Sequence, residues 1–344
     1  MKILVTGGAG FIGSTFVRLV LDQYPDDEVT TLDALTYAGN PANLLGLEAY
    51  GRHTFVQGDI ADAALADELV ERHDAVVNFA AETHVDRSLL DPGVFLRANV
   101  HGVYVLLDAV RRHGKRMLQV STDEVYGDIP PGKHSFESDA VNPRSPYSAA
   151  KAGGELFCRS FFVSYGTDVV ITRGSNTIGP RQYPEKLIPL FITNALRNEP
   201  LPVYGDGMQI RDWLHAEDHA AGIDRVLRRG RSGEIYNIGA GNETANIDVV
   251  RELVRYLGKD ESLLTFVPDR PGHDRRYAVD TSKIQEELGW EPSRSFYTQS
   301  LHDTIDWYVQ NPEWWKAIRD GSAEFERYYQ QQYGWRLAAA GQAS

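Results

Sequence analysis

The sequence predicts an α/β protein in which a doubly wound parallel sheet is joined to a smaller C-terminal α/β domain. Short apolar, β-branched runs alternate with longer amphipathic segments as far as Thr172, which is typical of parallel strands covered by helices on both faces. A glycine-rich turn follows the first apolar run, and glycine and proline become frequent beyond residue 175. These observations indicate one sheet domain followed by a domain of shorter elements.

The elements follow in order along the chain. The predicted strands are 3–5, 29–32, 53–56, 75–78, 117–120 and 169–172. The predicted helices are 14–22, 63–72, 94–113, 145–165, 246–257 and 300–310. We expect residues 1–175 to form the first domain and 176–335 mainly the second, with some chain returning to the first. The second domain should close over the carboxyl ends of the strands, where such sheets bind ligands. The tail 336–344 is predicted to be disordered.

The composition excludes several classes of protein. The formal net charge of −13 argues against a nucleic-acid or anionic-membrane partner, because the long-range field repels both. Cys158 is the only cysteine, so no intrachain disulfide or cysteine-based zinc site can form, and we expect no metal. We find no apolar run approaching the roughly 20 residues that span a bilayer. The apolar start 2–5 is too short for a signal peptide, so we expect a cytoplasmic protein.

Gly7, Gly10 and Gly13 lie between the first predicted strand and the helix that follows it. In a dinucleotide-binding turn, these glycines permit the tight turn, the approach of a diphosphate and the packing of helix on strand. The helix N-terminus then stabilises the phosphate charge. Asp33 lies 20 residues after Gly13, at the end of the second strand, where a carboxylate accepts the ribose hydroxyls and repels a 2′-phosphate. The sequence therefore predicts a Rossmann-type sheet that binds NAD rather than NADP.

Two further strand ends belong to this predicted cofactor site. Ala80 and Ala81 end the fourth strand with little bulk, as close approach of a cofactor requires. Asp59 and Ile60 follow the third strand and either flank the adenine or form a plain turn.

Tyr147 and Lys151 are four residues apart on a predicted helix, so their side chains share a face. A tyrosine with its ordinary pKa of about 10 is a poor base at neutral pH, but a nearby ammonium and a cationic nicotinamide ring favour the phenolate. The alternative is an incidental surface pair. The dinucleotide-binding turn earlier in the chain favours the catalytic interpretation.

Thr122, Asp123 and Glu124 follow the fifth predicted strand, at the carboxyl edge of the sheet where the nicotinamide would lie. The three residues would also suit a helix N-terminus, because Thr and Asp cap helices and Glu favours the dipole. Both roles are compatible. Adjacent carboxyls in a partly closed site can hold different protonation states, so that one acts as acid and the other as base.

The chain resembles the extended short-chain dehydrogenase/reductases, and within them the dTDP-glucose 4,6-dehydratases, from Met1 to about Tyr308. The resemblance rests on GGAGFIG (7–13), DALTYAGN (33–40), NFAAETHVDRS (78–88), STDEVYG (121–127), SPYSAAKA (145–152), PEKLIP (184–189), VYGDGMQIRDWLHAEDH (203–219) and RPGHDRRYAVD (270–280). The acid pair after Thr122 distinguishes this group from the 4-epimerases, which lack it, and from the GDP-mannose dehydratases, which have a different residue before the glutamate.

The resemblance implies an NAD-dependent hydro-lyase that oxidises a sugar at carbon 4, eliminates water across carbons 5 and 6, and returns the hydride to carbon 6. Tyr147 would take the 4-hydroxyl proton, Glu124 the carbon 5 proton, and Asp123 would protonate the departing 6-hydroxyl. Thr122 would hydrogen-bond the 4-hydroxyl. Lys151 would hold the nicotinamide ribose and tune the tyrosine.

The resemblance also implies the binding residues. The cofactor set is Gly7, Gly10, Phe11, Ile12, Gly13, Asp33, Ala34, Leu35, Thr36, Asp59, Ile60, Ala80, Ala81, Thr83, Tyr147, Lys151 and Thr177. The substrate set is His84, Thr122, Asp123, Glu124, Asn176, Lys186, Leu187, Pro202, Val203, Tyr204, Arg211, Asn246, Arg270 and His273. The fork of donors on arginine suits a diphosphate. Taken singly, each arginine or histidine is as readily a surface residue or a buried core residue.

Four positions depart from the family pattern. Thr177 and Ile178 lie in a segment that usually reads CSNNYGP, Thr83 replaces a serine, and Ala98 replaces a threonine. These changes leave the chemistry intact but bear on fine specificity. A modified hexose or another nucleotide is therefore an alternative substrate.

Helices 95–113 and 145–166 correspond to those that form a four-helix dimer interface in the family, so we expect a homodimer. The candidate interface residues are Leu106, Leu107, Val110, Leu156, Phe157 and Phe161. Burial in the core of the single chain is the alternative for each of them.

Other functions remain to be weighed against the dehydratase. Another sugar-nucleotide dehydratase, a 4-epimerase or a decarboxylase would share the fold, but the last two need no acid for a departing 6-hydroxyl. A non-catalytic NAD-sensing regulator could lose Tyr147, Lys151 or Glu124 without penalty, and all three are present. The sequence therefore favours the dehydratase.

Overall fold

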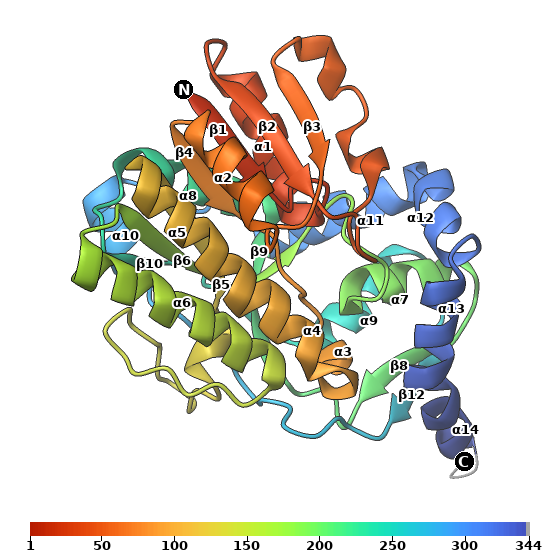
Figure 1. The fold of residues 1–344 in the computed structure, drawn as a ribbon. Helices are drawn as coiled ribbons and strands as arrows, with labels where there is room; N and C mark the ends of the chain where they lie inside the picture. The colour runs from red at the N-terminus through yellow and green to blue at the C-terminus, as the bar shows by residue number, and fades with distance from the viewer. Residues whose placement is uncertain (342–344) are drawn as a thin grey trace.

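The computed structural model describes residues 1–341 (Figure 1). The strands are β1 (Lys2–Thr6), β2 (Glu28–Asp33), β3 (His53–Gln57), β4 (Ala75–Asn78), β5 (Arg116–Thr122), β6 (Val169–Gly174), β7 (Asn176–Ile178), β8 (Leu201–Tyr204), β9 (Ile210–His215), β10 (Ile235–Ile238), β11 (Glu243–Ala245) and β12 (Leu264–Val267). The helices are α1 (Phe11–Gln23), α2 (Ala63–Glu71), α3 (Val85–Leu90), α4 (Pro92–Leu96), α5 (Val103–His113), α6 (Pro146–Tyr165), α7 (Leu187–Leu196), α8 (Ala216–Arg229), α9 (Asn246–Tyr256), α10 (Ser282–Leu288), α11 (His302–Gln310), α12 (Pro312–Arg319), α13 (Ala323–Tyr329) and α14 (Trp335–Gly341). Shorter helical segments include η3 (Arg97–Gly102), η4 (Asp123–Tyr126), η6 (Phe296–Leu301) and η7 (Gln330–Gly334).

The main sheet has seven parallel strands in the order β10-β6-β5-β4-β1-β2-β3. The six strands predicted from the sequence are all present in it, which confirms the doubly wound parallel fold. The seventh, β10, comes from the second half of the chain and pairs with β6. Because all the strands are parallel, the residues that follow β1, β2, β4 and β5 meet at one edge of the sheet.

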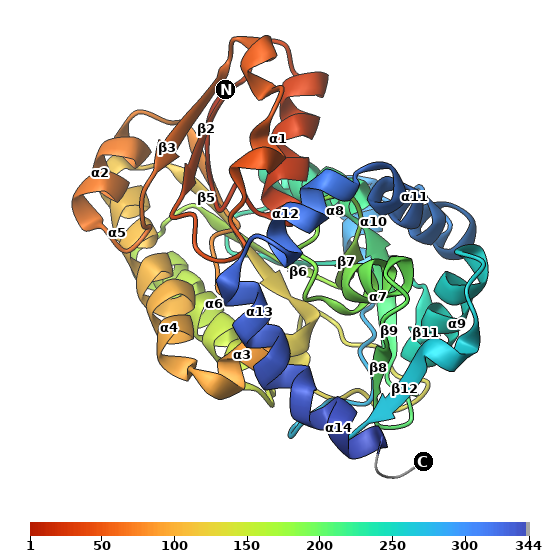
Figure 2. The ribbon, with the colours of Figure 1, turned by 90° about the vertical axis from the view of Figure 1, so that its right-hand side faces the viewer.

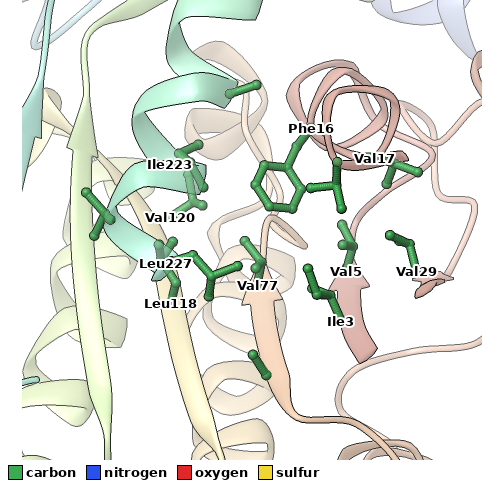
Figure 3. Close-up of a cluster of buried hydrophobic side chains, with 14 of the residues drawn as sticks. Ile3, Val5, Phe16, Val17, Val29, Val77, Leu118, Val120, Ile223 and Leu227 are labelled. Atoms are coloured by element: carbon green, nitrogen blue, oxygen red, sulfur yellow. The ribbon is translucent and has the colours of Figure 1, made fainter. Parts of the chain in front are cut away.

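Helices cover both faces of this sheet. On one face, α1, α8 and α10 pack on a core that includes Phe16, Val77, Leu118 and Ile223 (Figure 3). On the other face, α2, α5 and α6 bury a second cluster that includes Leu106. The helices therefore shield both apolar faces of the sheet from water. Strands that are apolar along their whole length need cover on both faces. This packing fixes the strand ends that carry the site.

The second half of the chain builds two small sheets beside the main one. β11, β9 and β7 form one, in which β7 and β9 are parallel and β11 is antiparallel to β9. β12 and β8 form a parallel pair. Helices α7, α9 and α11 pack on a separate apolar cluster that includes Phe191 and Tyr308. Meanwhile β10, α8 and α10 pack with the first sheet, so the second half contributes to both units.

One helical stretch, Pro92–His113, has the length and apolar composition of a membrane span, which differs from the expectation that no segment approaches this length. Half of its apolar window is buried inside the protein, and Leu106 and Val110 pack on the main sheet. Its apolar character is therefore explained in part by packing on the sheet.

The structure also differs from the sequence-based predictions for the interface residues and for the C-terminal tail. Leu106, Leu107, Val110 and Phe161 are buried within this chain, whereas Leu156 is 58% exposed and Phe157 is 39% exposed. Of the predicted tail, residues 336–341 continue helix α14, and Arg336 is buried with its guanidinium bonded to Gln332 O and Pro268 O. Residues 342–344 lie outside the described residues.

Candidate active site

A cavity of about 490 Å³ lies at the carboxyl ends of the main strands. Its floor is the glycine turn between β1 and α1. Gly7 has φ +70°, and a Cβ there would lie 2.5 Å from the backbone nitrogen of Ala80. A Cβ on Gly13 would lie 2.4 Å from the carbonyl oxygen of Gly7. Neither position accepts a side chain, so the backbone is left open to a diphosphate at the start of a helix, and this turn fits a dinucleotide.

Asp33 ends β2 and faces the same cavity. Its two carboxyl oxygens accept hydrogen bonds from the backbone N–H groups of Ala9 (2.9 Å) and Leu35 (2.8 Å). Burial raises the pKa of Asp33, and the two backbone donors oppose that shift. The carboxylate is therefore oriented by the glycine turn itself, where a ribose would lie.

The structure brings the predicted cofactor residues together with one exception. The cavity is lined by Gly7, Gly10, Phe11, Ile12, Gly13, Asp33, Ala34, Thr36, Asp59, Ile60, Ala80, Ala81, Thr83, Tyr147, Lys151 and Thr177. Leu35 is the exception, because it contributes its N–H to Asp33 rather than a wall. His219 also lines the cavity and was not predicted. Its ring lies 2.8 Å from the hydroxyl of Thr177. In the sequence, only its place as the fourth residue of the Ala-Glu-Asp-His start of α8 could have indicated it.

Thr122, Asp123 and Glu124 lie where β5 turns into η4. The hydroxyl of Thr122 accepts a hydrogen bond from the N–H of Glu124 and donates to a carboxyl oxygen of Asp123. The capping role and the position in the cavity are thus both present. The other carboxyl oxygen of Asp123 is buried and has no partner among the described residues.

The acid pair is electrostatically unequal. Burial, the neighbouring Glu124 and Asp212 raise the pKa of Asp123 well above its ordinary value, and Arg211 opposes this. Burial also raises the pKa of Glu124, but Arg270 and Arg211 oppose the shift. Asp123 is therefore suited to hold a proton and Glu124 to ionise first.

Tyr147 and Lys151 project from the first turns of α6 into the cavity. Burial and the carboxyls of Glu124 and Asp123 raise the pKa of Tyr147, which is opposite to the direction expected from Lys151 alone. Burial lowers the pKa of Lys151 to about 8. The raised pKa favours the neutral phenol, so activation of Tyr147 needs positive charge nearby.

A second cavity of about 150 Å³ adjoins the first, and the two share Glu124, Asn176, Glu185 and Lys186. It is lined by twelve of the fourteen predicted substrate residues, while the other two, Thr122 and Asp123, line the first cavity. The twelve are His84, Glu124, Asn176, Lys186, Leu187, Pro202, Val203, Tyr204, Arg211, Asn246, Arg270 and His273. The predicted acid pair therefore lies near the junction of the cofactor cavity and the substrate cavity.

The cations of the second cavity are held by specific partners. Arg270 donates to Asp86 at 2.8 Å, and its Nε is buried without a partner among the described residues. Arg211 donates to the carbonyl oxygen of Asp274 at 3.0 Å and lies over the ring of Tyr277. Lys186 donates to the carbonyl oxygen of Thr83 at 2.8 Å. Converging donors of this kind suit a diphosphate.

The sequence missed several residues of this cavity. They are Val85, Asp86, Glu185, Phe191, Gly207, Gln209, Trp213, Val250, Tyr277 and Tyr333. Asp86 and Glu185 lie inside motifs on which the resemblance rests, so they could have been predicted from the sequence. Tyr333 lies beyond those motifs, so nothing in the sequence pointed to it.

Comparison with known proteins agrees with this geometry. The family model described as GDP-mannose 4,6 dehydratase matches residues 4–300. A curated dTDP-glucose 4,6-dehydratase of Streptomyces griseus is 50% identical over 92% of this chain and 96% of its own length. A low-salt glycan biosynthesis protein of Haloferax volcanii is 51% identical over 91% and 100%. A solved dTDP-glucose 4,6-dehydratase of Streptomyces venezuelae, with NAD bound, superposes with a TM-score of 0.90 at 50% identity over 92% of this chain and 100% of that chain. The chain therefore belongs to the extended short-chain dehydrogenase/reductase family, in the group of the dTDP-glucose 4,6-dehydratases.

Proposed function

We propose that this chain converts dTDP-glucose to dTDP-4-keto-6-deoxyglucose and water, as a step of deoxysugar biosynthesis. The observation that carries the proposal is the unequal acid pair, in which Asp123 lines the first cavity and Glu124 lines both. Oxidation alone would need a base and a cofactor. Elimination also needs a base for the carbon 5 proton and an acid for the departing hydroxyl.

The side chains divide this work between them. Tyr147 takes the proton of the 4-hydroxyl, which Thr122 orients. Glu124 removes the carbon 5 proton that the new ketone acidifies, and Asp123 protonates the departing 6-hydroxyl. NAD, when bound, would supply the acceptor for the carbon 4 hydride and the donor of the hydride at carbon 6. Gly7, Gly13 and Asp33 are among the residues that would hold it, and Lys151 would hold its nicotinamide ribose.

We also infer a cytoplasmic homodimer that binds a nucleotide sugar and engages neither nucleic acid nor membrane. Helices α5 and α6 lie side by side in Figure 1, with α4 at one end. Their outer surface carries exposed apolar residues: Val94, Leu96, Tyr104, Leu156, Phe157, Val163 and Tyr165. Exposed apolar side chains on neighbouring helices support association with a second copy.

The direct test is to incubate the purified protein with dTDP-glucose, without added cofactor, and to measure the mass of the product. We expect loss of one water with no net NADH. Tyr147→Phe is the matched variant, because it keeps the ring and removes the hydroxyl, and it should leave the substrate unchanged. A product of unchanged mass but altered sugar configuration, formed with or without added NAD, would indicate an epimerase instead.

A further inference from the structure

Gln332 lies outside the residues that the family model matches, yet it is buried against the substrate cavity. It belongs to η7, between α13 and α14. Figures 1 and 2 show this C-terminal segment running past β8 and β12. Its next residue, Tyr333, forms part of the cavity wall and stacks on Tyr204. The end of the chain therefore completes the second cavity.

The amide of Gln332 has two specific partners. Its Nε2 donates to a carboxyl oxygen of Asp86 at 2.8 Å and to the hydroxyl of Tyr204 at 2.6 Å. Tyr204 in turn donates to the same oxygen of Asp86 at 2.9 Å. The three groups form a closed ring of hydrogen bonds in which both amide hydrogens are used.

The other carboxyl oxygen of Asp86 accepts from Arg270 at 2.8 Å. Asp86 is 3% exposed, so its orientation is set by these protein partners rather than by water. The ring holds one oxygen of Asp86, and the other oxygen holds one end of the Arg270 guanidinium through a charge-assisted hydrogen bond. The Nε of Arg270, which is buried and has no partner within residues 1–341, is left as a free donor.

The same segment also ties the two halves of the chain together. Glu324 pairs with Arg87 on α3, and the hydroxyl of Tyr328 lies 3.3 Å from Nδ1 of His84. Arg336 donates to the carbonyl oxygen of Pro268, just beyond β12. Gln332 thus lies where Asp86, from the first half of the chain, meets Tyr204 and Arg270 from the second half.

We propose that Gln332 is a positioning residue that, through Asp86, orients Arg270 toward the diphosphate of the nucleotide sugar. The inference rests on the proposed function, because it assumes a nucleoside diphosphate in the second cavity. Gln332 touches neither the acid pair nor the glycine turn, so its effect falls on substrate binding rather than on the chemical steps or on NAD.

The test is Gln332→Met, which keeps the volume and removes both donors, with dTDP binding measured by calorimetry. We expect dTDP to bind about tenfold more weakly, as loss of a hydrogen bond to a charged group allows. The KM for dTDP-glucose should rise alongside, while kcat and NAD content stay at the wild-type level. Gln331→Met, at the exposed neighbouring position, is the control and should change nothing.

A double-mutant cycle separates positioning from general destabilisation. In an Arg270→Gln background, Gln332→Met should weaken dTDP binding no further, because the group it orients is gone. Additive losses, or an equal loss of NAD, would overturn the proposal. If the wild type binds dTDP and Gln332→Met binds it with the same affinity, this inference alone is overturned. Wild-type protein that binds no dTDP would overturn the proposed function as well.

Discussion

The amine of Lys151 donates a 2.7 Å hydrogen bond to the carbonyl oxygen of Val120, at the end of β5. Lys151 lies one turn after Tyr147 on α6, yet its amine is fixed by the strand rather than free to follow the phenol. With a pKa lowered to about 8, the amine is still mostly protonated at pH 7. Lys151 therefore provides a fixed positive charge beside the cavity.

Replacing this charge should slow the oxidation step. In Lys151→Met, we expect the reduction of bound NAD by dTDP-glucose at pH 7 to fall by about two orders of magnitude, which is typical for loss of a group that assists proton transfer. Stopped-flow absorbance of NADH measures it directly. Lys133→Met, at an exposed position, is the control. An unchanged rate would show that the ammonium does not assist Tyr147.

Asp123→Asn should separate oxidation from dehydration. The amide keeps the shape of the side chain but has no acidic proton to transfer to the departing hydroxyl. We expect water loss to slow by about two orders of magnitude while NAD reduction changes little, so NADH and an oxidised, undehydrated sugar accumulate. Rapid quench with mass spectrometry follows both. Equal slowing of the two steps would remove the acid role.

Glu124→Gln should affect a different proton. Glutamine cannot accept the carbon 5 proton, so exchange of that position with deuterated solvent should be lost. NMR of the recovered sugar nucleotide measures the exchange, and Asp123→Asn serves as the comparison because it leaves this base in place. Undiminished exchange in Glu124→Gln would rule it out as the base.

The buried acid also makes stability depend on pH. The pKa of Asp123 is raised in the folded protein, so folding favours the protonated form. Its contribution is full below the unfolded pKa and is lost as pH rises toward the folded pKa. Asp123→Asn removes this dependence. The difference in unfolding free energy should move in favour of the variant as the pH rises above the ordinary pKa range of a carboxyl group, as measured by urea titration at each pH. A difference that is constant with pH would contradict the shift.

The sequence predicted correctly those features of the structure that depend on residues adjacent in the chain. The six strands, the glycine turn and the Thr122 cap each depend on a few adjacent residues, and the structure has all of them. β10 was missed because a four-residue strand in the second half gives no sign of the sheet it joins. The roles of Leu106 and Leu156 differ because amphipathic periodicity marks an apolar face without saying which neighbour covers it. Gln332 could not be found because its partners lie far away in the sequence.

The exposed surface of α6 should form part of the contact between the two copies. Leu156 and Val163 lie seven residues apart, hence on one face, and are 58% and 69% exposed. Leu156→Glu with Val163→Glu would place two carboxylates in the proposed interface, where burial without partners is costly. Light scattering should find the wild type at twice the 38.5 kDa chain mass and the variant at the chain mass. Leu45→Glu, also at a 69% exposed position but on another surface, should stay dimeric. A monomeric wild type would contradict the proposed dimer. A dimeric double variant would show that the two copies meet at another surface.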